Sequence, residues 1–274
     1  MQKYAALISY AGTDFCGWQK QRNASSGTFP SIQETMEQAL SKITGEKLSI
    51  VGSGRTDSGV HAVGQVAHFV LQDKRWDTMI LRKALNSLLP RPIRILEVRE
   101  VDPAFHAQKS AMKKQYSYYF QQGTSSLPHL EPYSWWIQKR LNLAAMSQAL
   151  KTLEGEHDFK PFQSSGAKPG STVRKILETE VIEQKIVFPQ TFEAVSLVRI
   201  RVVGTGFLKQ MVRGISGTLL QIGENRRPAS DMAEILRSQD RNLVGPTAPG
   251  RALWLERVWY KDLDFKLAWG QPLQ

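Results

Sequence analysis

The sequence predicts an α+β fold made of two ferredoxin-like halves, residues 1–108 and 109–274. In the first half, strand-like and helix-like runs follow one another in the order β-α-β-β-α-β. The second half repeats that order without repeating the sequence. A chain of 274 residues also approaches the upper size for a single core, so two coupled subdomains are expected. Joined edge to edge, they would form one extended, mostly antiparallel sheet with helices on one face and a cleft between the halves.

Two helices are predicted in the first half. Ser31 and Glu34 form the capping box expected at the start of the first one, which carries its apolar side chains at helical spacing. The second is predicted over Asp77–Leu88, because Pro90 and Pro92 follow it. The strand-like runs of this half are residues 3–10, 48–51, 65–70 and 93–101.

The second half contains three predicted helices. Asn142 is expected to cap one that reaches about Leu153, Phe207–Ile222 is long and apolar and ends at Gly223, and a short helix follows near residues 231–237. The strand-like runs are residues 115–121, 173–182, 192–203 and 253–260. Residues 161–171 are polar and rich in glycine, which is typical of a loop.

Composition limits the classes of function. The formal net charge of +11 and the pI near 9.8 suit a polyanionic partner, although charge alone is a weak indication. A single cysteine, Cys16, excludes an internal disulfide and a cysteine-based metal cluster, and the five histidines show no metal-ligand spacing. No apolar run reaches the roughly 18 residues of a membrane span. A strand pattern that begins at once leaves no room for a signal peptide, so a cytoplasmic protein is expected.

The stretch from Gly52 to Val66 is the most informative part of the chain. It lies between two strand-like runs, and three glycines within eight residues indicate a tight loop with positive φ. A carboxylate, Asp57, stands at its tip two residues after Arg55. The glycine spacing does not match a phosphate-binding fingerprint. From the residues alone, Asp57 could simply cap backbone N–H groups in an Asx-turn.

This stretch resembles the signature G-R-T-D-x-G-V-H-A-x-G-Q-V of the tRNA pseudouridine synthase A family, whose catalytic aspartate corresponds to Asp57. Residues 207–213 are similar to the family motif whose arginine pairs with that aspartate, which implies this role for Arg213. Residues 105–118 are similar to a third motif, whose first tyrosine corresponds to Tyr116; Gln108 replaces its usual arginine. Without the resemblance, Arg213 could be a snorkelling arginine and Tyr116 a core residue.

Two further matches extend the resemblance along the chain. Residues 9–21 are similar to the family opening, with Ala11 in place of its usual aspartate, and residues 245–251 match the C-terminal G-x-T-A-P. The resemblance therefore runs in order from residue 7 to residue 260.

The resemblance implies an enzyme that isomerises uridine to pseudouridine at tRNA positions 38, 39 and 40, needs no metal or other cofactor, and acts as a homodimer. Asp57 would be the nucleophile in the catalytic cleft between the halves, either attacking C1′ or assisting elimination to a glycal. Tyr116 would stack on the target base and could serve as a base. The residues expected to contact RNA are Trp18, Gln19, Lys20, Arg22, Arg55, His61, Lys109, Lys113, Lys114 and Lys168.

Three alternatives remain open at this point. A related synthase could act on another RNA position, and a non-catalytic RNA-binding protein could share the fold. A ferredoxin-like metabolic enzyme is disfavoured by the charge and by the missing cofactor motifs.

Overall fold

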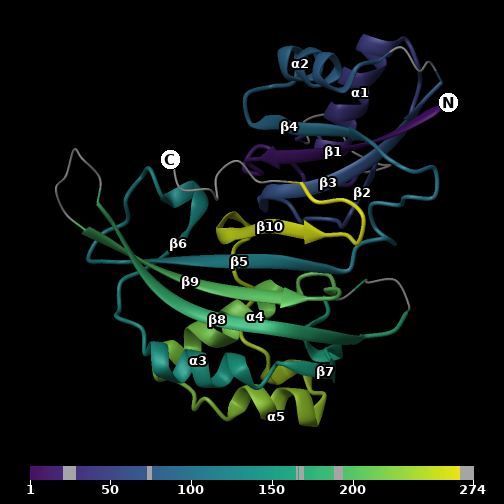
Figure 1. Ribbon diagram of the computed structural model, residues 1–274. Helices are drawn as coiled ribbons and strands as arrows, with labels where there is room; N and C mark the ends of the chain where they lie inside the picture. Colours follow the sequence, from purple (N-terminus) through teal and green to yellow (C-terminus); the bar gives the residue numbers. More distant parts are fainter. Residues whose placement is uncertain (21–28, 73–75, 165, 167–169, 188–193, 266–274) are drawn as a thin grey trace. The chain divides into compact units, whose positions relative to one another are not determined.

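The computed structural model describes residues 1–20, 29–72, 76–164, 166, 170–187 and 194–265, which form two compact units (Figure 1). Unit 1 contains the described parts of residues 1–113 and 255–274, and unit 2 contains those of residues 114–254. Five α-helices occur in the described part of the chain, and its strands pair mostly in antiparallel fashion. The predicted α+β class is confirmed.

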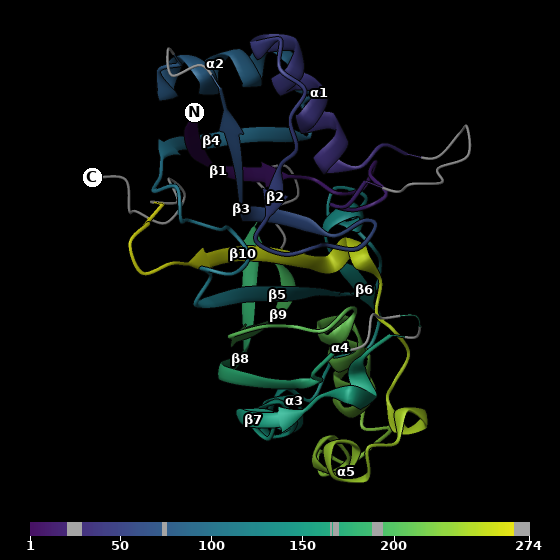
Figure 2. The ribbon, with the colours of Figure 1, turned by 90° about the vertical axis from the view of Figure 1, so that its right-hand side faces the viewer.

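Unit 1 is a small antiparallel sheet with two helices packed on it. Strands lie in the order β4-β1-β3-β10, and β2 pairs with a further part of β3. Helix α2 packs against β4 and against α1, and Figures 1 and 2 show both helices on one side of these strands. Its elements are β1 (Gln2–Tyr10), α1 (Ile32–Thr44), β2 (Val51–Gly52), β3 (His61–Leu71), α2 (Thr78–Leu88), β4 (Ile93–Glu100) and β10 (Leu253–Trp259).

Both helices of unit 1 begin at the predicted places, and each has a side-chain cap. The Ser31 hydroxyl accepts a hydrogen bond from the backbone N–H of Glu34 at 3.1 Å. The Asp77 carboxylate accepts two, from the N–H groups of Met79 and Ile80. The Glu34 carboxylate lies 3.3 Å from the Lys20 ammonium. The start of α1 is thereby tied to the segment that precedes it.

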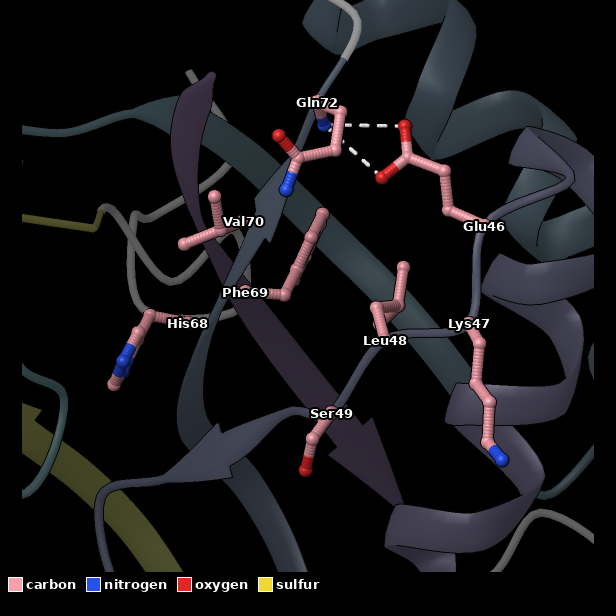
Figure 3. Close-up of a pocket in the computed structure, with 8 residues that line it drawn as sticks. All are labelled: Glu46, Lys47, Leu48, Ser49, His68, Phe69, Val70 and Gln72. Atoms are coloured by element: carbon pink, nitrogen blue, oxygen red, sulfur yellow. Dashed lines mark hydrogen bonds between the residues drawn. The ribbon is translucent and has the colours of Figure 1, made fainter.

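The strand expected at residues 48–51 is much shorter than its apolar run suggests. Only Val51 and Gly52 pair with β3, and the preceding segment leaves a cavity of about 330 Å³ beside it (Figure 3). At the far end of this gap, the Glu46 carboxylate accepts the N–H of Gln72 at 3.0 and 3.1 Å. A side chain therefore takes the place of a neighbouring strand at the end of β3.

Unit 2 combines mostly antiparallel strands with three helices. Its strands lie in the order β5-β9-β8-β7, and β6 runs parallel to β5. Helix α3 packs against β8, and both α4 and α5 pack against α3. The elements are β5 (Lys113–Gln122), β6 (Trp135–Ile137), α3 (Leu143–Lys151), β7 (Gly155–Asp158), β8 (Val173–Val187), β9 (Ala194–Gly204), α4 (Met211–Gly223) and α5 (Asp231–Ser238).

Unit 2 differs from the prediction at helix α4 and at three strands, of which β8 continues to Val187, beyond the predicted end at residue 182. Helix α4 begins at Met211 rather than at Phe207, because Gln210 adopts a left-handed conformation with φ of 61° immediately before it. The short strands β6 and β7 were not predicted; three or four residues are too few to show a periodic pattern.

The Asn142 cap of α3 is confirmed, since its side chain accepts the N–H of Ala145 at 3.1 Å. None of the helices in the described ranges is long and apolar enough to cross a membrane.

Candidate active site

The loop that carries Asp57 connects β2 to β3 and is closed by hydrogen bonds of its own. The N–H of Val60 donates to the Asp57 carbonyl at 3.2 Å, which forms a tight turn with Gly59 at a φ of 76°. Across the base of the loop, the Gln65 amide donates to the Gly54 carbonyl at 3.0 Å and accepts from the Ser53 hydroxyl at 2.6 Å. Asp57 itself is half-buried. Its position is therefore fixed by the backbone around it.

The segment after β1 clamps this loop from the other side. The N–H of Trp18 donates to the Thr56 carbonyl at 3.0 Å. Gly17 has a φ of 107°, and a Cβ atom there would lie 2.6 Å from the same carbonyl oxygen. A Cβ on Gly12 would lie 2.1 Å from the carbonyl oxygen of Val60. Only glycine allows the two backbones to approach this closely.

Tyr10 and Trp18 both contact Thr56 of the Asp57 loop. The Trp18 side chain is 2% exposed and covers Gly52, where an added Cβ would lie 2.5 Å from the indole. Its ring lies 6.2 Å from that of Tyr10. The Tyr10 hydroxyl shares a 2.8 Å hydrogen bond with the Thr56 hydroxyl, and burial raises the pKa of Tyr10 to about 12. This tyrosine therefore stays neutral and works as a hydrogen-bonding support.

The polar residues predicted around Asp57 fall into two groups. His61 is fully buried and its Nδ1 accepts the N–H of Gly12 at 3.1 Å, so its imidazole holds the segment after β1 against the Asp57 loop. Gln19 donates to the side chain of Gln33 at 2.8 Å. By contrast, Arg55 and Lys20 are exposed. The buried His61 therefore supports the Asp57 loop, whereas Gln19, Lys20 and Arg55 lie at the surface.

Unit 2 holds Arg213 in a comparable way. This residue lies in the first turn of α4, and its Nε donates to the Ala248 carbonyl at 2.7 Å while the N–H of Ala248 donates back to the Arg213 carbonyl at 3.2 Å. The segment that contains Ala248 approaches α4 closely, because a Cβ on Gly217 would lie 1.7 Å from the Pro246 carbonyl oxygen. The motif at residues 245–249, recognised in the sequence without a role, is the anchor of Arg213.

Tyr116 lies on β5, opposite Val202 of β9. Its side chain is 8% exposed, and its ring meets that of Phe207 edge-on at 5.0 Å. Two residues further along, the Tyr118 hydroxyl donates to the Pro249 carbonyl at 3.0 Å, and burial raises the pKa of this phenol above its usual range. The residues around Tyr116 thus connect the strand to the segment that anchors Arg213.

The remaining predicted RNA contacts are basic. Lys109 is exposed, and its backbone N–H donates to Nδ1 of His106 at 3.3 Å. The Lys113 ammonium lies 4.8 Å from the centre of the Trp259 ring. Burial lowers the pKa of Lys114 to about 8, so this amine loses part of its charge in mildly alkaline solution. Arg22 and Lys168 lie outside the described residues.

The proposed catalytic residues divide between the units, with Asp57 in unit 1 and Tyr116 and Arg213 in unit 2. Each is held by contacts within its own unit. Among the residues that the structure describes, no group of three or more histidine, cysteine, aspartate or glutamate side chains is arranged to hold a metal ion.

Comparison with known proteins identifies the family. A family model described as tRNA pseudouridine synthase matches residues 6–108 and 149–261. A tRNA pseudouridine synthase A from Maridesulfovibrio salexigens is 38% identical over 263 residues, covering 96% of this chain and 92% of the relative. Proteins of the same name from Thermoanaerobacter sp. and Lactococcus lactis are 35% and 37% identical, each covering at least 95% of this chain and at least 99% of the relative. The chain therefore belongs to the tRNA pseudouridine synthase family, and it is an isomerase that converts uridine to pseudouridine in tRNA.

Proposed function

We propose that this enzyme acts on uridines 38, 39 and 40 of the tRNA anticodon stem-loop and that Asp57 is its nucleophile. The observation that carries the proposal is the Asp57 turn. Its backbone is held on one side by Gln65 and on the other by Gly17 and Trp18. Catalytic groups must be held to within a fraction of an ångström, and a carboxylate with no more than an Asx-turn role would not need this double support.

The reaction requires one bond to break and another to form within the same nucleotide. The N1–C1′ bond of uridine is cleaved, the base turns while bound, and C5 bonds to C1′ and then loses its proton, while the freed N1 takes up a proton. An ionised carboxylate beside C1′ serves both open routes, since it can form an ester at C1′ or take up the 2′ proton during elimination to a glycal. Atoms and electrons balance without any external oxidant, reductant or group donor.

The other site residues complete this proposal. Arg213 is the cationic partner that keeps the Asp57 carboxylate ionised, and its anchor on Ala248 supports that role because it fixes the guanidinium at one nitrogen. Tyr116 stacks on the target base and takes up the C5 proton. Arg55, exposed two residues before Asp57, fills the space that the flipped uridine leaves or holds the neighbouring phosphate.

The proposal also covers the remaining RNA contacts, the oligomeric state, the location and the domain limits. Gln19, Lys20, Arg22, Lys109, Lys113, Lys114 and Lys168 contact RNA, and the buried Trp18 and His61 act by positioning the Asp57 loop. A homodimer, a cytoplasmic location, ferredoxin-like halves with limits at residues 108 and 109, and the cleft between those halves remain predictions.

The test is to replace Asp57 by asparagine and to map new pseudouridine in an unmodified tRNA transcript by base position. We expect a loss of at least about 10⁴-fold in turnover with tRNA affinity nearly unchanged. Asp14→Asn is the matched control, because Asp14 is an exposed carboxylate on the neighbouring segment. Activity of Asp57→Asn within tenfold of the wild type would remove the nucleophile from the proposal. Pseudouridine only outside positions 38–40 would favour the related synthase with another target.

A further inference from the structure

Two cations of unit 1 share one aromatic ring. The Lys113 ammonium lies 4.8 Å from the centre of the Trp259 ring, and the Arg257 guanidinium carbon lies 5.0 Å from it. The two charged groups are therefore within about 10 Å of each other. The backbone is fixed at the same place, since the N–H of Met112 donates to the Trp259 carbonyl at 2.8 Å. Lys113, Arg257 and Trp259 are called the Trp259 cluster below.

The cluster is accessible to a ligand from solvent. All three side chains are only partly buried, and the Arg257 side chain is 40% exposed. A carboxylate, Asp264, lies 3.2 Å from Arg257 but is itself 73% exposed. An ion pair this open is weak and is readily exchanged for another anion.

The Lys113 and Arg257 side chains carry the same charge and lie on one ring, whose negative face interacts favourably with each of them. An anion with more than one charge near this ring can therefore interact with both cations. Phosphates follow one another along a nucleic acid strand at roughly 3.4 Å of axial rise. Cations no more than about 10 Å apart can thus reach phosphates of the same strand.

We propose that the Trp259 cluster binds the sugar–phosphate backbone of the tRNA substrate. This inference rests on the proposed function. Lys113 and Arg257 each neutralise one phosphate, Trp259 holds the two cations in place, and Asp264 competes with the RNA for Arg257. Lys113 was expected to contact RNA from the sequence; the structure adds Arg257 and Trp259 and gives the contact a geometry.

The experiment measures the affinity for tRNA at several salt concentrations. Each phosphate contact contributes a slope of about −0.7 to −0.9 to the plot of log K against log salt, so Lys113→Gln and Arg257→Gln should each make the slope less steep by nearly one. Between 50 and 200 mM salt, each variant should lose about threefold less affinity than the wild type. Lys83→Gln on α2 removes the same charge from an exposed position of unit 1 and should leave the slope unchanged.

Removal of the competing carboxylate should change the affinity for tRNA in the opposite direction. Asp264→Asn should tighten binding because Arg257 loses its competing carboxylate, and this gain should disappear in the Arg257→Gln background. Glu100→Gln is the control, since it removes an exposed negative charge from β4.

Trp259→Phe, which keeps an aromatic face, should retain more affinity for tRNA than Trp259→Leu. Lys113→Arg and Arg257→Lys should restore the slope and so exclude a folding defect.

Wild-type conversion separates the two possible failures. If the wild type forms no pseudouridine in tRNA, the proposed function fails whatever the slopes are. If the wild type converts tRNA but the slopes of Lys113→Gln and Arg257→Gln stay unchanged, or if Lys83→Gln lowers the slope equally, the Trp259 cluster is not a phosphate site.

Discussion

Replacement of Gly17 by alanine tests whether the clamp on the Asp57 loop sets the rate of the reaction. At a φ of 107°, the new Cβ would meet the Thr56 carbonyl oxygen at 2.6 Å, so the two backbones must separate. Positive φ costs an alanine about 1 kcal/mol, and losing the hydrogen bond from Trp18 to Thr56 costs about another 1 kcal/mol. We therefore expect a loss of about 2–3 kcal/mol in the free energy of unfolding. A displacement of the loop by about 1 Å would lower single-turnover conversion about 100-fold.

Gly45→Ala is the matched control for this substitution. Gly45 also has a positive φ, 73°, but an added Cβ there meets no atom within 4 Å. Its substitution should cost only the conformational part, about 1 kcal/mol, and should leave conversion unchanged. Urea unfolding and single-turnover assays on both variants give the comparison. If Gly17→Ala behaves like Gly45→Ala in both assays, the clamp does not position Asp57.

Three further outcomes follow from the contacts described above. Gly217→Ala should destabilise unit 2 and lower turnover, because the new Cβ would lie 1.7 Å from the Pro246 carbonyl oxygen. Its control is Gly214→Ala, where the nearest atom to the new Cβ would be 3.4 Å away; urea unfolding should show this variant to be neutral or stabilised. Arg213→Lys should lower turnover at least tenfold with tRNA affinity retained in a binding assay, since lysine has no Nε to donate to Ala248. Burial, with smaller contributions from His106 and Lys3, lowers the pKa of His68 from 6.5 to about 4. His68 therefore binds a proton more readily in the unfolded chain than in the folded one, so its contribution to the free energy of unfolding is full above pH 6.5 and should fall by up to about 3 kcal/mol by pH 4. His68→Asn should make the free energy of unfolding, measured with urea, depend less on pH over this range.

The sequence predicted most elements because their signals are local. The predicted caps Ser31 and Asn142 set the starts of two helices, and Asp77, the first residue of the predicted second helix, caps a third. The start of α4 was misplaced because a left-handed Gln210 has no signature in the residue type. The strand at residues 48–51 was overextended, since an apolar run reports burial but not whether a partner strand is present.

The candidate site was predicted from motifs rather than from geometry. Asp57, Arg213 and Tyr116 were found through a resemblance that carries no distances. What the residues alone could not show is how the loop is supported, because Gly12 and Gly17 contact residues more than thirty positions away. The same holds for Trp18 and His61, which a sequence pattern cannot distinguish from exposed RNA contacts before their burial is known.

The carboxylate of Glu46 at the end of β3 has a consequence for solubility. An open strand end presents a row of unpaired N–H and C=O groups, which is a template on which a second chain can add a strand and begin aggregation. Glu46 occupies the N–H of Gln72 with a charged group that offers no further donor, so an incoming strand would have to displace it. Glu46 thus places a negative charge at the end of β3 that β2 does not cover, which disfavours pairing with a second chain there.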